Sequence, residues 1–253
     1  MNIIVLGAGT FGTAIANELS VNTCNNVLLY SRDHKKVAEI NSQNTNKSCF
    51  PNKQLSKHLK ATCDINDISN ASIVFIALPS NVILESLKIL NPYFQENVLL
   101  VNLSKGMLVG GVTIVESIQK ELNINNVVTL KGPSFAVEIM EHADTLLTLG
   151  YTTIEQYNII KKILKDTSFY IDSTTDIRGV ELLSVLKNIY ALVLGVIDAK
   201  YNSSNTRFMI LTKAFSEVRV LLKLLGGVEA TLFLACGFGD LCLTSLNDLS
   251  RNR

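Results

Sequence analysis

Two lysines of this 253-residue chain, Lys187 and Lys105, are candidates for catalytic residues. Lys187 lies in the middle of a long apolar segment, 179–199, which we expect to form a largely buried helix. Burial lowers the pKa of a lysine, so its ammonium group could donate a proton to a carbonyl oxygen near neutral pH. The alternative is a structural lysine that pairs with a carboxylate such as Glu181.

Polar side chains recur on one face of this expected helix, at Glu181, Ser184, Lys187 and Asn188. Such a stripe on an apolar helix needs polar partners. Asp240, in a glycine-framed turn, could orient or pair with Lys187, and Thr244 would share its face if that segment is helical. Arg251 would be a bidentate ligand for an anion if it folds back toward these groups, and a solvated tail residue if it does not.

A glycine-rich loop near the start of the chain has the spacing G-x-G-x-x-G, with Gly7, Gly9 and Gly12. It follows a strand-like run, 2–6, and opens a helix-length segment, 11–20. There the first glycine allows a tight turn, the second lets the backbone approach a pyrophosphate, and the third lets the helix pack on the strand. The loop therefore predicts a dinucleotide site on the helix N-terminus. The alternative is a strand–helix turn with no ligand.

The choice of dinucleotide depends on the residues after the second strand-like run, 26–30. An NAD-selective site usually carries Asp or Glu there for the ribose hydroxyls, but this chain has Ser31 and Arg32, followed by Asp33. A guanidinium suits a 2′-phosphate in charge and geometry, so Arg32 favours NADP(H), with NAD(H) left open. In the alternative, Arg32 is solvated and Asp33 caps the next helix.

Ligands of open α/β sheets bind beyond the carboxyl ends of the strands. Lys105 follows the expected strand 97–101 and would point its ammonium into that crevice, or lie on the surface as a solvated lysine. Gly132 and Ser134, after the run 127–130, offer a close backbone approach and a hydroxyl, or only the start of a helix.

The elements that must position these residues alternate between strand-like and helix-length segments. The apolar runs are expected to be strands, at 2–6, 26–30, 72–78, 97–101, 127–130 and 168–171. They are continuously apolar, as burial on both faces of a parallel sheet requires. The expected fold class is α/β, with a Rossmann-type doubly wound parallel sheet in a dinucleotide-binding domain over 1–173. Residues 174–253 are expected to form a smaller all-helical catalytic domain, short enough to suggest truncation.

Composition excludes several classes of protein. The net charge of +1 gives no footprint for nucleic acid or an anionic membrane. Five cysteines without a C-x-x-C spacing predict neither a disulfide framework nor a metal site, and favour the cytoplasm. The longest wholly apolar stretch of the later helix, 189–197, is too short to span a membrane.

Taken together, these pieces resemble the soluble NAD(P)-dependent glycerol-3-phosphate dehydrogenase family. The matching segments run in order along nearly the whole chain: 7–12, 104–106, 132–136, 179–181, 186–188, 237–240, 243–244 and 250–253. The resemblance implies reversible reduction of dihydroxyacetone phosphate to sn-glycerol 3-phosphate, feeding glycerophospholipid synthesis. It implies a small-molecule substrate as the partner and no nucleic acid, and it leaves a homodimer open.

The resemblance also implies the residue roles. Lys187 would donate the proton, with Lys105 and Asp240 as further catalytic residues. Substrate contacts are implied for Lys105, Gly132, Ser134, Lys187, Asn188, Asp240, Thr244, Ser250, Arg251 and Asn252. Cofactor contacts are implied for Gly7, Gly9, Thr10, Phe11, Gly12, Arg32, Lys105, Ala136 and Arg251. The family continues well beyond the last of these motifs, so a truncated, weakly active or inactive remnant that still binds dinucleotide is the alternative.

Overall fold

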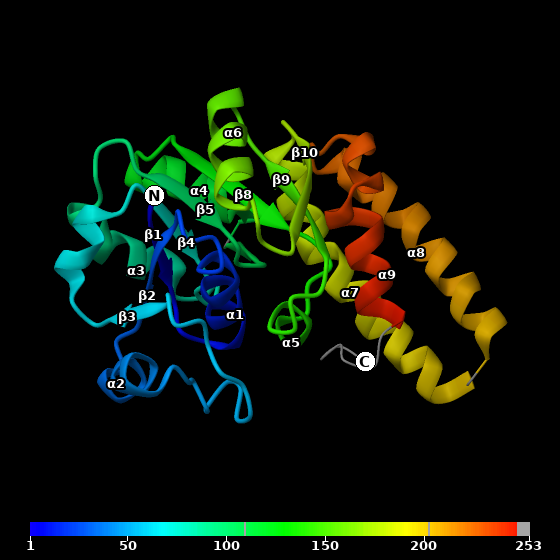
Figure 1. The fold of residues 1–253 in the computed structure, drawn as a ribbon. Coiled ribbons are helices and arrows are strands. Elements are labelled where there is room, and N and C mark those ends of the chain that lie inside the picture. Colours follow the sequence, from blue (N-terminus) through cyan, green and yellow to red (C-terminus); the bar gives the residue numbers. More distant parts are fainter. Residues whose placement is uncertain (109, 202, 247–253) are drawn as a thin grey trace.

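A twisted eight-stranded sheet forms the centre of the molecule, with helices on both faces and a helical part at one end (Figure 1). The structure is a computed structural model and describes residues 1–108, 110–201 and 203–246. The strands, in spatial order, are β10 (Phe169–Thr174), β9 (Thr145–Gly150), β8 (Val127–Lys131), β5 (Leu99–Asn102), β4 (Ile73–Ile76), β1 (Asn2–Leu6), β2 (Asn26–Tyr30) and β3 (Lys60–Thr62). A small hairpin of β6 (Met107–Leu108) and β7 (Val112–Thr113) follows β5.

The helices of the sheet region are α1 (Thr10–Leu19), α2 (His34–Gln43), α3 (Ile83–Leu90), α4 (Ile114–Leu122), α5 (Ala136–Ile139) and α6 (Ile154–Ile163). The predicted Rossmann-type α/β sheet, followed by a helical part, is confirmed. It is not parallel throughout, because β9 pairs with β8 in the antiparallel direction and β10 then runs parallel to β9. Strands β3 and β9 were not predicted.

Two apolar cores lie on the two faces of the sheet. Successive strand residues point to opposite faces, so Ile3 and Val5 of β1 belong to one core while Ile4 and Leu6 belong to the other. The first core also contains Ile15 of α1 and Ile160 of α6. The second contains residues of α3 and α4, among them Leu87 and Ile118. This double burial explains why the strand sequences are continuously apolar.

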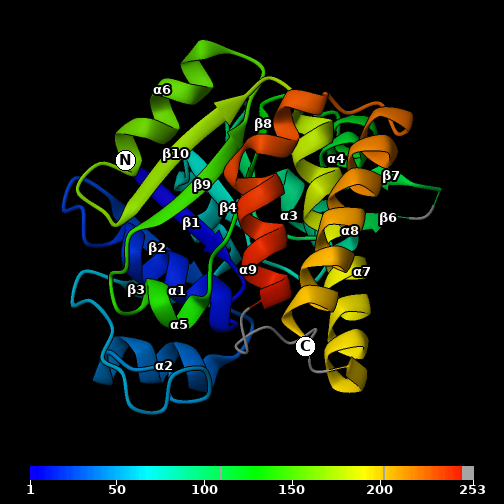
Figure 2. The ribbon, with the colours of Figure 1, turned by 90° about the vertical axis from the view of Figure 1, so that its right-hand side faces the viewer.

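The helical part consists of α7 (Ile177–Tyr201), α8 (Ser204–Leu224) and α9 (Asp240–Leu246), with short helical turns at Glu229–Phe233 and Ala235–Gly239 (Figure 2). Its own core joins Leu183 and Leu194 of α7 to Leu222 of α8 and Leu241 of α9. Helix α7 also packs on β8 and β9, so it ties the two parts together. The division between residues 173 and 174 stays a prediction.

Among the described residues, helix α7 is long and apolar enough to cross a membrane by length and composition. More than half of its apolar window is buried inside the protein. It also carries the buried charged side chains of Glu181 and Lys187. These properties are those of the core helix of a folded domain.

Candidate active site

The carboxyl ends of β1, β5 and β8 lie at one edge of the sheet, since these strands belong to its parallel portion. Gly7 follows β1, Lys105 follows β5, and Gly132 follows β8. The fold therefore gathers three of the sequence-predicted segments at one edge. Helices α7 and α9 approach the same region and bring in the groups that are far away in the sequence.

One buried carboxylate joins the two candidate lysines. Asp240 begins α9 and is 1% exposed. Its Oδ2 accepts a hydrogen bond from Lys105 Nζ at 2.9 Å, and its Oδ1 accepts one from Lys187 Nζ. Lys187 Nζ also donates to Thr244 Oγ1 at 2.9 Å, one turn further along α9. The structure thus brings together Lys105, Lys187, Asp240 and Thr244, with two positive charges on one negative charge.

The environment of Lys187 weakens its hold on its proton. Burial lowers the pKa of Lys187 below the ordinary value for lysine, and the nearby ammonium of Lys105 lowers it further. The carboxylate of Asp240 acts in the opposite direction and keeps part of the proton affinity. A lysine with a lowered pKa beside a cationic neighbour is suited to proton transfer near neutral pH.

The loop after β8 lies against the turn that leads into α9. A Cβ placed on Gly239 would stand 3.4 Å from Cγ of Pro133, so this loop approaches Asp240 from the sheet side. Ser134 Oγ donates to the carbonyl of Gly132 at 3.1 Å, and Ala136 begins α5. On α7, the side-chain amide of Asn188 donates to the carbonyl of Ser184 at 3.2 Å. The predicted residues Ser250, Arg251 and Asn252 lie outside the described residues.

The predicted polar stripe of α7 does not face a single neighbour. At about 100° per residue, Glu181 and Lys187 are separated by about 120° around the helix axis. Lys187 accordingly meets α9, whereas Glu181 turns to the sheet. The expected pairing partner for a lysine, Glu181, is therefore paired with Lys131 of β8, at 3.5 Å, and not with Lys187.

The glycine loop has the geometry that the spacing G-x-G-x-x-G predicts. Gly7 has φ of +106°, in the region that favours glycine, and a Cβ on Gly12 would stand 2.0 Å from the carbonyl oxygen of Gly7. A Cβ on Gly9, by contrast, would meet nothing within 4 Å. Helix α1 starts at Thr10, so the first N–H groups of the helix, those of Thr10 and Phe11 included, lack partners within it.

A cavity of about 310 Å³ opens beside this loop, and it is lined by Gly7, Ala8, Gly9, Tyr30, Ser31, Arg32, Asp33, Lys36 and Leu78. Arg32 lines the cavity, and the carboxylate of Asp33 caps α2 by accepting from the N–H groups of Lys35 and Lys36. The helix cap expected of Asp33 is therefore observed, while the role of the exposed Arg32 toward a cofactor stays a prediction. Lys36 of α2, whose Nζ donates to the backbone carbonyl of Ala8 at 3.0 Å, also lines the cavity and was not predicted.

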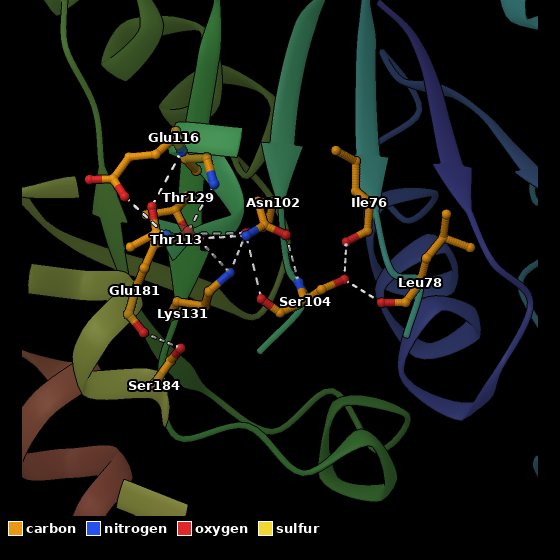
Figure 3. A network of polar contacts seen from close by, with 11 residues as sticks. Ile76, Leu78, Asn102, Ser104, Thr113, Glu116, Thr129, Lys131, Glu181 and Ser184 are labelled. Atoms are coloured by element: carbon orange, nitrogen blue, oxygen red, sulfur yellow. Dashed lines mark hydrogen bonds and ion pairs between the residues drawn. The ribbon is translucent and has the colours of Figure 1, made fainter. Parts of the chain in front are cut away.

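A buried polar network next to the site was also missed (Figure 3). It links Asn102, Thr129, Lys131 and Glu181 across the ends of β5 and β8. A signal was present in the sequence, because Lys131 ends an otherwise apolar strand and a buried lysine needs an acid. The partner, fifty residues later, could not be identified from that signal alone.

No group of three or more His, Cys, Asp or Glu side chains in the described part of the chain is arranged to hold a metal ion. The charged groups that the structure brings together at this site are the ammonium groups of Lys105 and Lys187 and the carboxylate of Asp240.

The chain matches two family models in succession. Residues 2–157 match the NAD-dependent glycerol-3-phosphate dehydrogenase N-terminus, and residues 176–253 match the corresponding C-terminus. Together these models account for nearly the whole chain.

Relatives and solved structures agree with this match. The chain is 30% identical to the glycerol-3-phosphate dehydrogenase [NAD(P)+] of Neorickettsia sennetsu, over 100% of the chain and 75% of that protein. It is 33% identical to the enzyme of the same name from Thermoanaerobacter sp., covering 76% of it. The crystal structure of glycerol-3-phosphate dehydrogenase from Coxiella burnetii superposes with a TM-score of 0.90 at 28% identity, over 99% of this chain and 77% of that one. The chain thus spans about three quarters of the length of these relatives.

Two glycine substitutions separate folding from ligand approach. Gly12→Ala should destabilise the protein by about 1–3 kcal/mol, because its methyl group overlaps the Gly7 carbonyl and forces α1 away from β1. Gly9→Ala should leave the stability within about 0.5 kcal/mol, because its methyl group meets open space. It should nevertheless weaken NADPH binding about tenfold or more, since a pyrophosphate would occupy that space. Denaturant unfolding and NADPH titration measure both effects. Wild-type NADPH affinity in Gly9→Ala, or wild-type stability in Gly12→Ala, would contradict this account of the loop.

Proposed function

The chain belongs to the NAD-dependent glycerol-3-phosphate dehydrogenase family, and we propose that it reversibly reduces dihydroxyacetone phosphate to sn-glycerol 3-phosphate, with NADPH or NADH as the reductant. The observation that carries the proposal is the arrangement of Lys105 and Lys187 on the shared carboxylate of Asp240. Reduction of a ketone needs a proton donor at the oxygen, and binding of a phosphate ester needs positive charge. The two lysines supply both, with one net positive charge left after pairing with Asp240.

We assign the proton-donating role to Lys187. Its Nζ is held by Asp240 and Thr244, so the ammonium has a fixed position. A reduced nicotinamide, when bound, supplies the hydride to the carbonyl carbon. Lys187 transfers a proton from Nζ to the carbonyl oxygen, which completes the alcohol. Its lowered pKa favours this transfer near neutral pH.

We assign substrate orientation to the residues around this pair. Lys105, whose side chain is 28% exposed, presents its remaining N–H groups to the ketone and the phosphate. Thr244 holds Lys187. Gly132, Ser134 and Asn188 remain proposed substrate contacts on the resemblance in sequence. Ser250, Arg251 and Asn252 remain proposed phosphate ligands on the resemblance in sequence.

The residues present fit a dinucleotide. Gly9 leaves open space beside the N-terminus of α1, where N–H groups can bind a pyrophosphate. Arg32 and Lys36 line the adjoining cavity and offer two cations for a 2′-phosphate, which supports NADP(H) as the preferred cofactor. Gly7, Thr10, Phe11, Gly12 and Ala136 remain proposed cofactor contacts.

We propose that the protein acts in the cytoplasm. All five cysteines are free thiols, which fits the reducing cytoplasm. The product would feed glycerophospholipid synthesis. A homodimer stays a prediction, supported by the exposed apolar side chains of α7 and α8, among them Leu192, Val196 and Phe208. Relatives named as dehydrogenases match the chain over its full length, and this favours an enzyme over a dinucleotide-binding remnant.

The first test is the loss of NADPH absorbance with dihydroxyacetone phosphate. The wild-type chain should turn over, and Lys187→Met should lower kcat by roughly 10²–10⁴-fold because the proton donor is lost. The NADPH dissociation constant should stay unchanged, since Lys187 lies outside the cavity by the glycine loop. Undiminished turnover in Lys187→Met would remove it as the donor. A flat trace from folded, NADPH-binding wild-type protein would favour the remnant.

The pH dependence tests the pairing of Lys187 with Asp240. In the direction of ketone reduction Lys187 must be protonated, so the rate should fall as pH rises through its lowered pKa, at a lower pH than an ordinary lysine would allow. Asp240→Asn removes the carboxylate that raises the pKa of Lys187, so the decline should shift to still lower pH. Glu121→Gln, which changes a carboxylate paired with Lys88 far from the site, is the control and should leave the profile in place. If the decline in rate of Asp240→Asn occurred at the wild-type pH or at a higher pH, the pairing of Lys187 with Asp240 would not determine the pH dependence.

Cofactor choice tests Arg32. Arg32→Gln should raise the dissociation constant of NADPH roughly 10- to 100-fold, because a charge-assisted hydrogen bond contributes about 1.5–3 kcal/mol. Binding of NADH, which lacks the 2′-phosphate, should change little. Lys35→Gln removes a neighbouring exposed cation outside the cavity lining and serves as the control. Equal losses for both cofactors would assign Arg32 to a part of the ligand that they share.

A further inference from the structure

Lys131 is a completely buried lysine that the proposed mechanism does not use. It ends β8, and its side chain is 0% exposed. Its Nζ donates to the backbone carbonyl of Asn102 at 2.8 Å and lies 3.5 Å from Oε1 of Glu181. Burial lowers the pKa of Lys131 to about 8, with the charge of Glu181 opposing the shift. Burying such a pair carries a large desolvation cost, so its placement calls for an explanation beyond packing.

Its partner Glu181 connects four elements at one point. Oε1 of Glu181 accepts from the side-chain amide of Asn102 at 2.5 Å and from the hydroxyl of Thr129 at 2.8 Å. Oε2 accepts from the backbone N–H of Val115 at 3.0 Å, in the first turn of α4. The carboxylate therefore fastens α7 to β5, β8 and α4 (Figure 3).

This junction leads directly to Lys105. Oδ1 of Asn102 accepts from the N–H of Ser104 at 2.9 Å. Ser104 Oγ in turn donates to the carbonyl of Leu78 at 2.5 Å, across to the segment after β4. The turn is thus held on both sides, and Lys105 is the next residue. Any shift of Asn102 would move the backbone that aims the Lys105 ammonium at Asp240.

The same junction leads to Lys187 through the helix. Glu181 and Lys187 lie on α7, six residues apart, which is about 9 Å along a rigid helix. Fixing Glu181 against the sheet therefore fixes the height and rotation of α7, and with them the position of the Lys187 ammonium. Lys105 and Lys187 come from different segments, yet both depend on this one buried junction.

We propose that Lys131 is a positioning residue for the reaction: its buried ion pair with Glu181, together with its bond to the Asn102 carbonyl, holds the Asn102–Ser104 turn against α7 and so sets the distance between Lys105 and Lys187. The expected effect on turnover rests on the proposed function, but the contacts of Lys131 with Asn102 and Glu181 are a property of the folded chain. Lys131 does not touch the substrate; it acts through Asn102 and Glu181.

The test variant is Lys131→Met, which keeps an unbranched side chain and removes the ammonium. We expect kcat to fall roughly 10- to 100-fold, because small misplacements of catalytic groups have effects of this size. The KM values for NADPH and dihydroxyacetone phosphate should stay within about twofold, since a positioning defect affects the chemical step. A general loss of folded protein, by contrast, would leave kcat per folded site unchanged. Lys88→Met, which makes the same change in an exposed ion pair with Glu121, is the control and should behave as wild type.

Hydrogen exchange gives a readout that does not require activity. In Lys131→Met, peptides covering 102–106 should exchange faster than in wild type or Lys88→Met, while peptides of β1 and β2 keep their protection. If the wild-type chain shows no turnover, the proposed function fails, and the comparison of hydrogen exchange alone decides whether Lys131 holds the Asn102–Ser104 turn in place. Unchanged exchange at 102–106, or wild-type kcat in Lys131→Met, would overturn the proposal.

A second variant covers the case in which Lys131→Met does not fold because Glu181 is left as an uncompensated buried charge. Lys131→Met combined with Glu181→Gln removes both charges and with them the burial penalty. This double variant should fold, retain NADPH binding, and still show the lowered kcat and faster exchange at 102–106, because the bond from Nζ to the Asn102 carbonyl stays lost. A folded double variant with wild-type kcat would refute the positioning role.

Discussion

The carboxylate of Asp240, buried and shared by Lys105 and Lys187, is the interaction on which the site depends. Two ammonium groups repel each other, and the repulsion is stronger at a partly buried site than in bulk water. The carboxylate of Asp240 lies between them and accepts a hydrogen bond from each, which offsets this repulsion. The lowered pKa of Lys187 expresses the same balance, since burial and Lys105 outweigh the stabilisation by Asp240.

The sheet and the helical part serve this balance in different ways. The parallel strands deliver the glycine loop, the segment of Lys105 and the loop at Gly132 to one edge. The helical part brings Lys187 and Asp240 to that edge from the other side. The two parts must keep a fixed relation, and the contacts of α7 with β8 and β9 provide it through apolar packing and the network of Glu181. The hydrogen bonds and ion pair of this junction restrict the relative position of the two parts more than apolar packing alone, because donors and acceptors fit together in one arrangement.

Local sequence was sufficient to predict the glycine loop and six of the eight strands of the central sheet. Gly7, Gly9 and Gly12 have roles that follow from backbone geometry, and continuous apolar runs follow from burial on both faces. Strand β9 was not predicted because two threonines interrupt its apolar run, and it is its pairing with β8 and β10 in the folded chain that makes it a strand. The partners of Glu181 and Lys131 could not be predicted for a related reason. A polar stripe on a helix shows which residues need partners, but the partners lie on other elements. Because Glu181 and Lys187 are separated by about 120° around α7, they contact different elements.

Charge at this edge of the sheet is balanced but not fully neutralised. With all three lysines protonated, Lys105, Lys131 and Lys187 contribute three positive charges, and Glu181 and Asp240 contribute two negative charges. Complete neutralisation would leave little attraction for an anionic phosphate ester, whereas three unpaired buried ammonium groups would oppose folding. Pairing Lys131 with Glu181 makes the junction neutral, so the remaining positive charge is confined to the groups around Asp240. The two pairs still influence each other, since the charge of Lys105 is one of the causes that lower the pKa of Lys131.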